Sequence, residues 1–388
     1  MKIAFCLSSL PGYSETFIRS TLDGLSRDGH DVRVFIFNRS RAAENFVYVN
    51  PFPLVMPRVL FLFPLVLARL LIKRPVASFT YWKSEKADGK KTWSIIKSLY
   101  INAHIFLAQK PDWLHYSFAT LGIHRENLAK ALGIKLAVSL RGFDIGIYPL
   151  RHPGCYHLLW RKVDKIHTIS DDLYRLALKE GLAQTTPVQK IRPAIQTEKL
   201  IRKKDPGVIK SPCRILSVGR LEWKKGFEYA LLAMKKLNER GVDFSYRIVG
   251  AGGLEDQLKF AILELGLSEK VTLLGKISHD EVFQQMHDAD LYLQPSIQEG
   301  FCNSLLEAQG TGLLCIASDA EGLTENVLHD ETGWIVHRRN YNALAETIER
   351  IIEMPLARRK TIAERAMQRV KEEFAIARLV REFGEFYH

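Results

Sequence analysis

Two glutamates, Glu299 and Glu307, stand eight positions apart around a glycine turn that follows an apolar, strand-like run. The residues between them are typical of a helix start, whose unpaired amides and dipole favour anions such as a diphosphate. Carboxylates accept hydrogen bonds from hydroxyls, so Glu299 suits a sugar and Glu307 a ribose diol. The alternative is an acidic residue near a helix N-terminus with an ordinary surface Glu behind it. The amides expected to bind the anion are those of Gly300, Phe301, Cys302, Asn303 and Ser304.

A basic loop upstream offers two cations to the same anion. Arg220 and Lys225 lie between a predicted short strand and a helical pattern that begins near Phe227. A guanidinium presents a planar fork to an oxyanion and an ammonium a mobile point charge, so together they can neutralise a departing diphosphate. A solvated basic loop is the alternative. Further on, Gly250 ends another strand-like run, where backbone can approach a ligand closely.

Taken in order and spacing, these motifs resemble family 4 glycosyltransferases over about residues 212–345. The resemblance implies a GT-B fold, in which two Rossmann-like domains face each other across a cleft. It also implies retaining transfer from a nucleotide-sugar donor with no cofactor and no bound metal. Arg220, Lys225 and Glu299 would be the catalytic residues, and Glu307 would hold the ribose. The matching segments are Val218–Leu221 with Lys225–Gly226, Val249–Gly252, Leu274–Gly275, Ala289–Ser296, the two glutamates and Thr332–Val336.

The N-terminal half resembles the same family more loosely. Its opening, Pro11–Ile18, is similar to exopolysaccharide transferases of the colanic-acid type, which predicts a donor contact at Gly12. Many relatives place two adjacent glycines in this loop, and this chain has one. The acceptor implied by the resemblance is a glycan or a lipid-linked glycan.

A second departure concerns a loop where relatives commonly carry His-Gly-x-Asp and this chain carries Arg141 to Asp144. Arg141 can donate hydrogen bonds to a sugar or phosphate, but it cannot act as a neutral acid or base. We therefore expect Arg141 to bind the donor and Asp144 to lie on the acceptor side. His115 is a further acceptor-side candidate, with a satisfied structural histidine as the alternative.

Length and pattern predict an α/β protein of two domains, because 388 residues exceed the size at which a single core usually keeps growing. We expect a Rossmann-like acceptor-binding domain at residues 1–200 and a Rossmann-like nucleotide-sugar domain at 201–370. By the resemblance, a helix at 371–388 returns to the first domain. The polar segment Arg202–Gly207 is the best linker candidate.

Charge is unevenly divided between the halves. Residues 1–200 hold 29 Lys and Arg against 15 Asp and Glu, whereas the whole chain holds 55 against 43. The basic excess of the first half suggests an acidic acceptor or an anionic membrane surface. Nucleic acid is not expected as a partner, because no recognisable nucleic-acid module accompanies the charge.

The most apolar stretch of the chain, Pro51–Arg74, lies in this basic half. Its uninterrupted part, Val59–Ala68, is too short to cross a bilayer. Two alternatives remain: an interfacial segment that dips into lipid, or a helix packed in the core. Lysines between residues 83 and 97 and the tryptophans Trp82 and Trp93 favour the interfacial alternative. The residues expected to meet headgroups are Arg58, Arg69, Lys73 and Arg74.

Five scattered cysteines form neither a zinc motif nor a disulfide framework. A reduced, cytoplasmic protein is the simplest expectation, either free or peripheral on the inner face of the plasma membrane. The apolar start of the chain is interrupted by Pro11, so we interpret it as a first strand rather than a signal peptide.

Three other classes of function stay open. A metal-dependent GT-A transferase could use Asp288 and Asp290 as hard oxygen ligands. By the resemblance, however, Asp290 stands directly before a strand of the family, which indicates a structural role for it. A sugar-nucleotide epimerase shares the GT-B framework. A non-catalytic sugar- or lipid-binding protein is the third.

Overall fold

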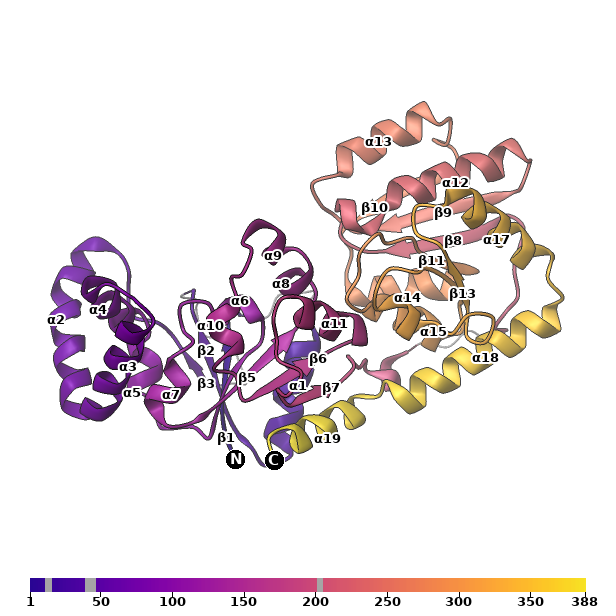
Figure 1. Cartoon of the computed structure of the whole chain (residues 1–388). Coiled ribbons are helices and arrows are strands. Elements are labelled where there is room, and N and C mark those ends of the chain that lie inside the picture. Colours follow the sequence, from indigo (N-terminus) through magenta and orange to yellow (C-terminus); the bar gives the residue numbers. More distant parts are fainter. Residues whose placement is uncertain (11–15, 39–46, 201–204) are drawn as a thin grey trace. The chain divides into compact units, whose positions relative to one another are not determined.

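The computed structural model describes residues 1–10, 16–38, 47–200 and 205–388 (Figure 1). The chain divides into two compact units, one of Met1–Arg192 with Leu379–His388 and one of Pro193–Arg378, here called unit 1 and unit 2. The sequence places the boundary at residue 200. Residues 202–204 of the predicted linker lie outside the described residues, and 205–207 belong to unit 2.

Unit 1 is built on a parallel sheet with the order β3-β2-β1-β4-β5-β6-β7 in its described residues. The central strands are buried along nearly their whole length, as in sheets covered on both faces. The first strand confirms the interpretation of the chain start. The strands are β1 (Lys2–Leu7), β2 (Asp31–Ile36), β3 (Val47–Val49), β4 (Trp113–Tyr116), β5 (Lys135–Leu140), β6 (Lys165–Thr168) and β7 (Val188–Lys190).

Helices fill the connections of this sheet, and α2 to α5 occupy the long one between β3 and β4 (Figure 1). The helices are α1 (Thr16–Arg27), α2 (Met56–Lys73), α3 (Pro75–Ala87), α4 (Thr92–Ile101), α5 (Ala103–Leu107), α6 (Ala119–Gly122), α7 (Leu128–Leu132), α8 (Phe143–Gly146), α9 (Tyr148–Arg151), α10 (His157–Trp160) and α11 (Asp171–Lys179). Among the described residues, no helix is both long enough and apolar enough to cross a membrane.

The predicted apolar stretch forms α2, which buries Val66 and Leu70 and leaves most of its other apolar side chains exposed or half-exposed. It is therefore not a fully buried core helix. Arg58, Arg69 and Lys73 are exposed, as an outward-facing role requires. Arg74 differs from that expectation. Its guanidinium donates to the carbonyls of Phe106 and Ala108, at 3.1 and 2.9 Å, and so ties the α2–α3 junction to the body of the unit.

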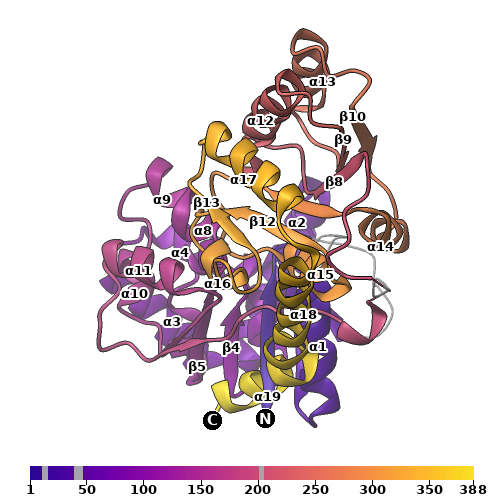
Figure 2. The same ribbon diagram turned by 90° about the vertical axis from the view of Figure 1, so that its right-hand side faces the viewer.

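Unit 2 contains a second parallel sheet, with the order β10-β9-β8-β11-β12-β13 among its described residues (Figure 2). The strands are β8 (Cys213–Val218), β9 (Phe244–Val249), β10 (Val271–Gly275), β11 (Leu291–Gln294), β12 (Leu314–Ser318) and β13 (Trp334–Val336). The helices are α12 (Phe227–Glu239), α13 (Glu255–Glu264), α14 (His279–Asp288), α15 (Asn303–Thr311), α16 (Leu323–Asn326), α17 (Tyr341–Glu353) and α18 (Leu356–Glu373).

Alternate residues of each strand enter different cores, because successive side chains of a strand point to opposite faces. Ile215 packs with side chains of α12, α13 and α17, whereas its neighbour Leu216 packs with those of α14 and α15. The segment 371–388, expected to be one helix, contains the end of α18 and the whole of α19 (Ile376–Phe386). The end of α19 is held against the unit 1 sheet, where Trp113 Nε1 donates to the Tyr387 carbonyl at 2.9 Å.

Both sheets have the doubly wound order. The chain starts near the middle of the sheet, adds strands toward one edge, and then returns to the middle to add strands toward the other edge. The α/β class and the two Rossmann-like units are therefore confirmed. In such sheets a ligand binds beyond the carboxyl ends of the strands, at the point where the strand order reverses. In unit 2 that point lies between β8 and β11. The predicted basic loop and the predicted Glu299 loop follow these two strands.

Candidate functional site

The loops after β8 and β11 pack directly on each other. Gly226 has φ +65°, and a Cβ at this position would lie 2.3 Å from the Pro295 carbonyl oxygen. The Lys224 carbonyl accepts the amide of Ile297 at 2.7 Å. Glycine is required where two backbones come this close. These contacts bring the basic loop against the loop that carries Glu299.

A third loop, after β9, is also joined to the basic loop. Gly250 has φ +146°, and its Cβ would lie 1.8 Å from the Gly219 carbonyl oxygen. A Cβ at Gly252 would lie 2.4 Å from the Leu221 carbonyl oxygen. The sequence suggested that these glycines allow close approach of a ligand. The observed close approach is to the neighbouring loop, so Gly250 positions the backbone that carries Arg220.

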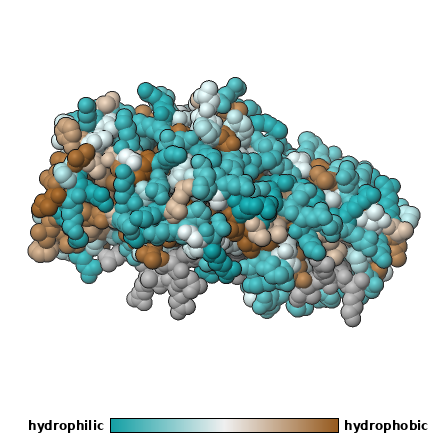
Figure 3. Space-filling view, turned by 90° about the horizontal axis from the view of Figure 1, so that it is seen from below, coloured by the Kyte–Doolittle hydropathy of each residue, from teal (hydrophilic) through white to brown (hydrophobic). Residues whose placement is uncertain are grey.

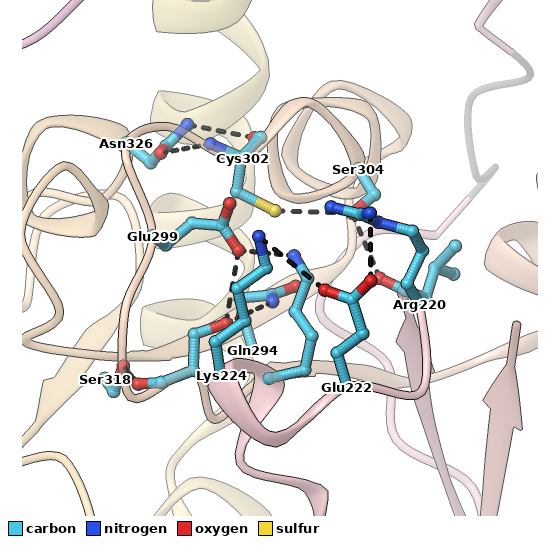
Figure 4. Close-up of polar contacts among 12 residues, drawn as sticks. Arg220, Glu222, Lys224, Gln294, Glu299, Cys302, Ser304, Ser318 and Asn326 are labelled. Atoms are coloured by element: carbon cyan, nitrogen blue, oxygen red, sulfur yellow. Dashed lines mark hydrogen bonds and ion pairs between the residues drawn. The ribbon is translucent and has the colours of Figure 1, made fainter. Parts of the chain in front are cut away.

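Lys225 and Glu299 form an ion pair at the centre of these loops, between Nζ and Oε2 (Figure 4). Both side chains are largely buried, at 11% and 14% exposure. Burial lowers the pKa of Lys225, but the carboxylate of Glu299 raises it more, and the net pKa lies above the ordinary value. Lys225 is therefore an ammonium at neutral pH. Two residues 74 positions apart are thus joined in one charged group.

Behind Glu299, a buried chain of polar side chains follows one face of β11. Gln294 Nε2 donates to Ser296 Oγ at 2.8 Å, and Ser296 Oγ donates to Glu299 Oε2 at 3.3 Å. At the other end, the Tyr292 hydroxyl lies 3.1 Å from Gln294 Oε1 and 2.8 Å from Ser304 Oγ. The sequence motifs did not point to these residues. The signal was available in the alternation of polar Tyr292, Gln294 and Ser296 within an otherwise apolar strand.

The Glu299 loop is also held from the segment after β12. Glu321 accepts the Glu299 amide at 2.8 Å. Asn326 brackets Cys302, accepting its amide and donating to its carbonyl, each at 3.1 Å (Figure 4). A Cβ at Gly322 would lie 1.9 Å from the Gly300 carbonyl oxygen. No spacing in the sequence indicates these partners, because the contacts arise only when β11 and β12 lie side by side.

The helix start predicted to bind an anion is α15, which begins at Asn303 with no side-chain cap at Cys302. Fewer of its amides can bind an anion than expected, because the Cys302 amide donates to Asn326 Oδ1. Phe301 packs its ring on Phe374, with ring centroids 5.8 Å apart. Burial also raises the pKa of the Cys302 thiol, so this side chain is neutral. Removing Cys302 from the predicted set leaves the amides of Gly300, Phe301, Asn303 and Ser304 as candidate anion donors, and the last two lie in the first turn of α15.

Arg220 extends from the same centre toward solvent, with a side chain that is 58% exposed. Its guanidinium is paired with Glu222 at 2.9 Å (Figure 4). An exposed pair of this kind is weak, because solvent screens the charges. Arg220 can therefore exchange Glu222 for a more highly charged partner such as a phosphate.

Glu307, on the second turn of α15, has a partner that the sequence motifs did not indicate. His279 Nε2 lies 3.0 Å from Glu307 Oε1. Hydrogen bonding to Glu307 raises the pKa of His279. Ser278 fixes the histidine in place by forming a capping box with Glu281 at the start of α14. The predicted ribose acceptor is therefore already oriented by an imidazole.

The candidates of unit 1 lie in a different setting. Gly12 falls outside the described residues. His115 is fully buried and contacts the Tyr387 hydroxyl and Ser139 Oγ, the latter at 2.8 Å. Burial lowers its pKa well below the ordinary value. These contacts agree with the alternative of a structural histidine. The neutral imidazole links Tyr387, directly after α19, to the sheet.

Asp144 is also buried rather than open to an acceptor. Its carboxylate accepts the amides of Ala119, Arg141 and Gly142 at 2.9–3.0 Å. Burial raises its pKa. These bonds make Asp144 the residue that shapes its loop, and the acceptor-side role expected for it stays a prediction. Arg141 Nε donates to the Ser117 carbonyl at 3.3 Å, and its side chain is half-buried at the carboxyl ends of β4 and β5.

The predicted structural role of Asp290 agrees with its contacts. Its two carboxylate oxygens accept from Arg214 Nε and Nη2 at 3.1 and 2.9 Å, which is a bidentate pair. Across residues 1–10, 16–38, 47–200 and 205–388, no three His, Cys, Asp or Glu side chains form a group suited to a metal ion. We therefore assign no metal ligands.

Comparison with known proteins agrees with this site. The sequence profile of "Glycosyl transferases group 1" matches residues 199–369. The amylovoran biosynthesis glycosyltransferase AmsK of Erwinia amylovora is 27% identical over 380 residues, which cover 90% of each chain. The colanic acid biosynthesis glycosyltransferase WcaL of Escherichia coli is 26% identical over 406 aligned positions, covering 96% of each chain.

Solved structures agree at the level of the fold. Sucrose-phosphate synthase from Thermosynechococcus elongatus superposes with a TM-score of 0.76 at 17% identity, covering 100% of this chain and 98% of that one. HepE from Anabaena, solved in complex with UDP and glucose, superposes with a TM-score of 0.71 at 18% identity, covering 99% and 98%. The predicted GT-B fold is confirmed. The predicted resemblance is confirmed as well: residues 199–369 match the glycosyltransferase group 1 profile, and the chain is similar along nearly its full length to the amylovoran and colanic acid glycosyltransferases.

Proposed function

We propose that the protein is a retaining family 4 glycosyltransferase that moves a hexose from a nucleotide diphosphate sugar to a glycan in surface polysaccharide biosynthesis. The observation that carries the proposal is the buried Lys225–Glu299 pair at the switch point of unit 2, beside the uncapped start of α15. Such a site combines a cation and free amides for a diphosphate with a carboxylate for sugar hydroxyls. HepE, which shares the fold, binds UDP and glucose.

The proposed chemistry follows from the charges that develop during transfer. Breaking the bond between the anomeric carbon and the phosphate builds positive charge on the sugar ring and negative charge on the diphosphate. Lys225, Arg220 and the first amides of α15 would stabilise the leaving diphosphate, and Glu299 would hold the sugar. Groups fixed in place before the reaction stabilise such charge most effectively. The network from Tyr292 to Ser296 and the clamps of Glu321 and Asn326 supply this fixation.

Retention of the anomeric configuration requires either two inversions or attack on the same face. We assign no carboxylate as a nucleophile, so we propose same-face transfer in which the leaving phosphate helps to deprotonate the acceptor hydroxyl. Metal independence is part of the same proposal, because the cations and helix amides would perform the work of a divalent ion.

The acceptor is proposed from the relatives and from charge. AmsK and WcaL are named for the biosynthesis of amylovoran and colanic acid. The basic residues of the first half suit an acidic glycan or a glycan linked to a lipid. Five free cysteines fit a reducing compartment, so we propose that the enzyme works on the cytoplasmic side, at the inner face of the plasma membrane.

A donor-panel assay tests the function. Purified protein is given UDP- and GDP-sugars with and without EDTA, and release of the nucleoside diphosphate is measured. We expect turnover of one donor at the same rate in both conditions. Loss in EDTA with rescue by manganese would favour a metal-dependent transferase, and conversion to an epimeric sugar would favour an epimerase. Binding without turnover of any donor, even with an acceptor extract, would favour a non-catalytic protein.

A further inference from the structure

Large exposed apolar side chains are concentrated on one part of unit 1. Of the twenty found among the described residues, twelve lie between Leu54 and Trp93, on α2, α3, the start of α4 and the turn before α2. Figure 3 shows apolar atoms gathered at one edge of the molecule, over α2. Single apolar residues on a surface are ordinary, but a contiguous group marks an interaction surface.

On α2 the exposed apolar residues form one face. Phe61, Leu65 and Ile72 follow each other at spacings of four and seven residues, which places them along one side of a helix. Their exposure is 71%, 54% and 79%. Val66 and Leu70, which are buried, anchor the opposite side to the unit. Helix α2 thus differs from an ordinary surface helix, because its outward face is apolar.

A basic edge runs beside this face. Arg58, Arg69 and Lys73 are exposed and follow each other at spacings of eleven and four residues, so they also lie along one line of the helix. The nine Lys and Arg between residues 54 and 97 are accompanied by two acids, Glu85 and Asp88. Glu85 is buried and accepts from Asn127, and Asp88 is paired with Lys162. Neither acid offsets the basic edge.

The neighbouring helix ends add aromatic side chains. Trp93, at the start of α4, is 67% exposed and lies against Phe63 of α2, with ring centroids 6.0 Å apart. Phe79 and Trp82 stack on each other on α3 at 6.3 Å, and both are exposed. Tryptophan is enriched where an apolar medium meets a polar one, because the ring is apolar and its N–H is polar.

We propose that this face, formed by α2, α3 and the start of α4, docks on the surface of a phospholipid bilayer that contains anionic lipid. In this arrangement α2 lies parallel to the bilayer, with Phe61, Leu65 and Ile72 at the acyl boundary and the basic edge at the phosphates. A second copy of the chain fits less well, because a symmetric dimer would place the same strongly basic face of both copies against itself. The inference deepens the proposed function, since a lipid-linked acceptor lies on such a surface.

Vesicle flotation tests the docking. The full-length protein is mixed with phosphatidylcholine vesicles with or without phosphatidylglycerol. We expect flotation with the anionic vesicles and its loss as salt rises, because exposed charges are screened. The double variant Phe61→Asp/Ile72→Asp should bind about tenfold or more weakly. The triple variant Arg58→Gln/Arg69→Gln/Lys73→Gln should also bind more weakly. Phe260→Asp/Leu263→Asp, on the equally exposed face of α13, is the matched control and should bind as wild type does.

Two outcomes would overturn the docking. The first is that the wild-type protein does not bind anionic vesicles at low salt. The other is a lipid-free dimer in sedimentation that Phe61→Asp/Ile72→Asp converts to monomer, which would make this face a contact between copies. Donor turnover separates this inference from the proposed function. The double variant should keep wild-type release of nucleotide from the donor in solution. Vesicle binding by a protein that turns over no donor would remove the proposed function and leave the docking intact.

Discussion

At the scale of the residue, the central group is the pair of Lys225 and Glu299. Their types and spacing relative to glycine turns identified both from the sequence. Their contact, however, depends on a Gly226 backbone that touches the Pro295 carbonyl, and no local pattern reports that approach. The same holds for Glu321 and Asn326, which reach the Glu299 loop from the next strand. Sequence alone predicts which residues can do chemistry more readily than it predicts which residues fix those side chains and loops in position.

His279 gives a prediction at this scale. Because Glu307 raises its pKa, we expect the imidazole to titrate above 6.5 in the folded protein, and Glu307→Gln to bring it back toward that value. A ¹H–¹³C NMR titration of the ring measures both. The raised pKa also means that the pair contributes stability below pH 6.5 and loses it as pH rises through the folded pKa. The contribution should be at most about 1 kcal/mol, because His279 is half-exposed.

A titration of His279 at the same pH in wild type and Glu307→Gln would contradict this contact. Replacing Glu331, which lies in another turn, by Gln is the control and should leave the His279 titration unchanged.

At the scale of the element, the glycines at strand ends determine how the site loops meet. Gly250→Ala should lower the free energy of unfolding by more than about 2 kcal/mol, because its Cβ would overlap the Gly219 carbonyl and its φ of +146° is unfavourable for alanine. Gly253→Ala is the matched control, since no atom lies within 4 Å of its Cβ. Urea unfolding measures both. Equal stability of the two variants would show that the β9 loop does not constrain the basic loop.

The clamp on Cys302 gives a second prediction for an element. Asn326→Ala removes both hydrogen bonds to the Cys302 backbone and should cost about 1–3 kcal/mol of stability. It should also reduce transfer by folded protein, because the Glu299 loop and the start of α15 lose their support. Asn340→Ala, which removes the cap of α17, should cost about 1 kcal/mol and leave transfer unchanged. Transfer per folded molecule that is equal in the two variants would exclude a positioning role for Asn326.

Helix α2 shows where sequence reasoning stops at this scale. Its apolar run is compatible with burial and with exposure, because the pattern does not state which neighbours cover it. The structure shows that only Val66 and Leu70 are buried, and that Arg74 is used to anchor the helix rather than to face outward. Propensity and spacing located the element, and tertiary packing decided its faces.

At the scale of the whole molecule, the two parallel sheets, the α/β class and the glycosyltransferase domain were all predictable, because strand and helix patterns alternate along the chain and the donor motifs are dense after residue 212. The acceptor half was less predictable. His115 lies near the end of β4 and Asp144 lies in α8, just after β5; functional residues are common in such places, but both side chains are buried among hydrogen-bond partners. Burial of a polar residue at such a place requires partners that only the fold brings together.

The proposed function depends on Lys225 and Glu299 acting on the donor. The most direct test is the rate of sugar transfer by Lys225→Ala and Glu299→Gln, with the donor identified by the panel and folding checked by urea unfolding. Lys259→Ala, which removes an exposed helix pair on α13, is the control. We expect each site variant to lose about 10²-fold or more in rate, as removal of one group that stabilises a transition state commonly does, and the control to keep the wild-type rate. Folded Lys225→Ala and Glu299→Gln proteins that transfer sugar within threefold of the wild-type rate would contradict the proposed role of this pair.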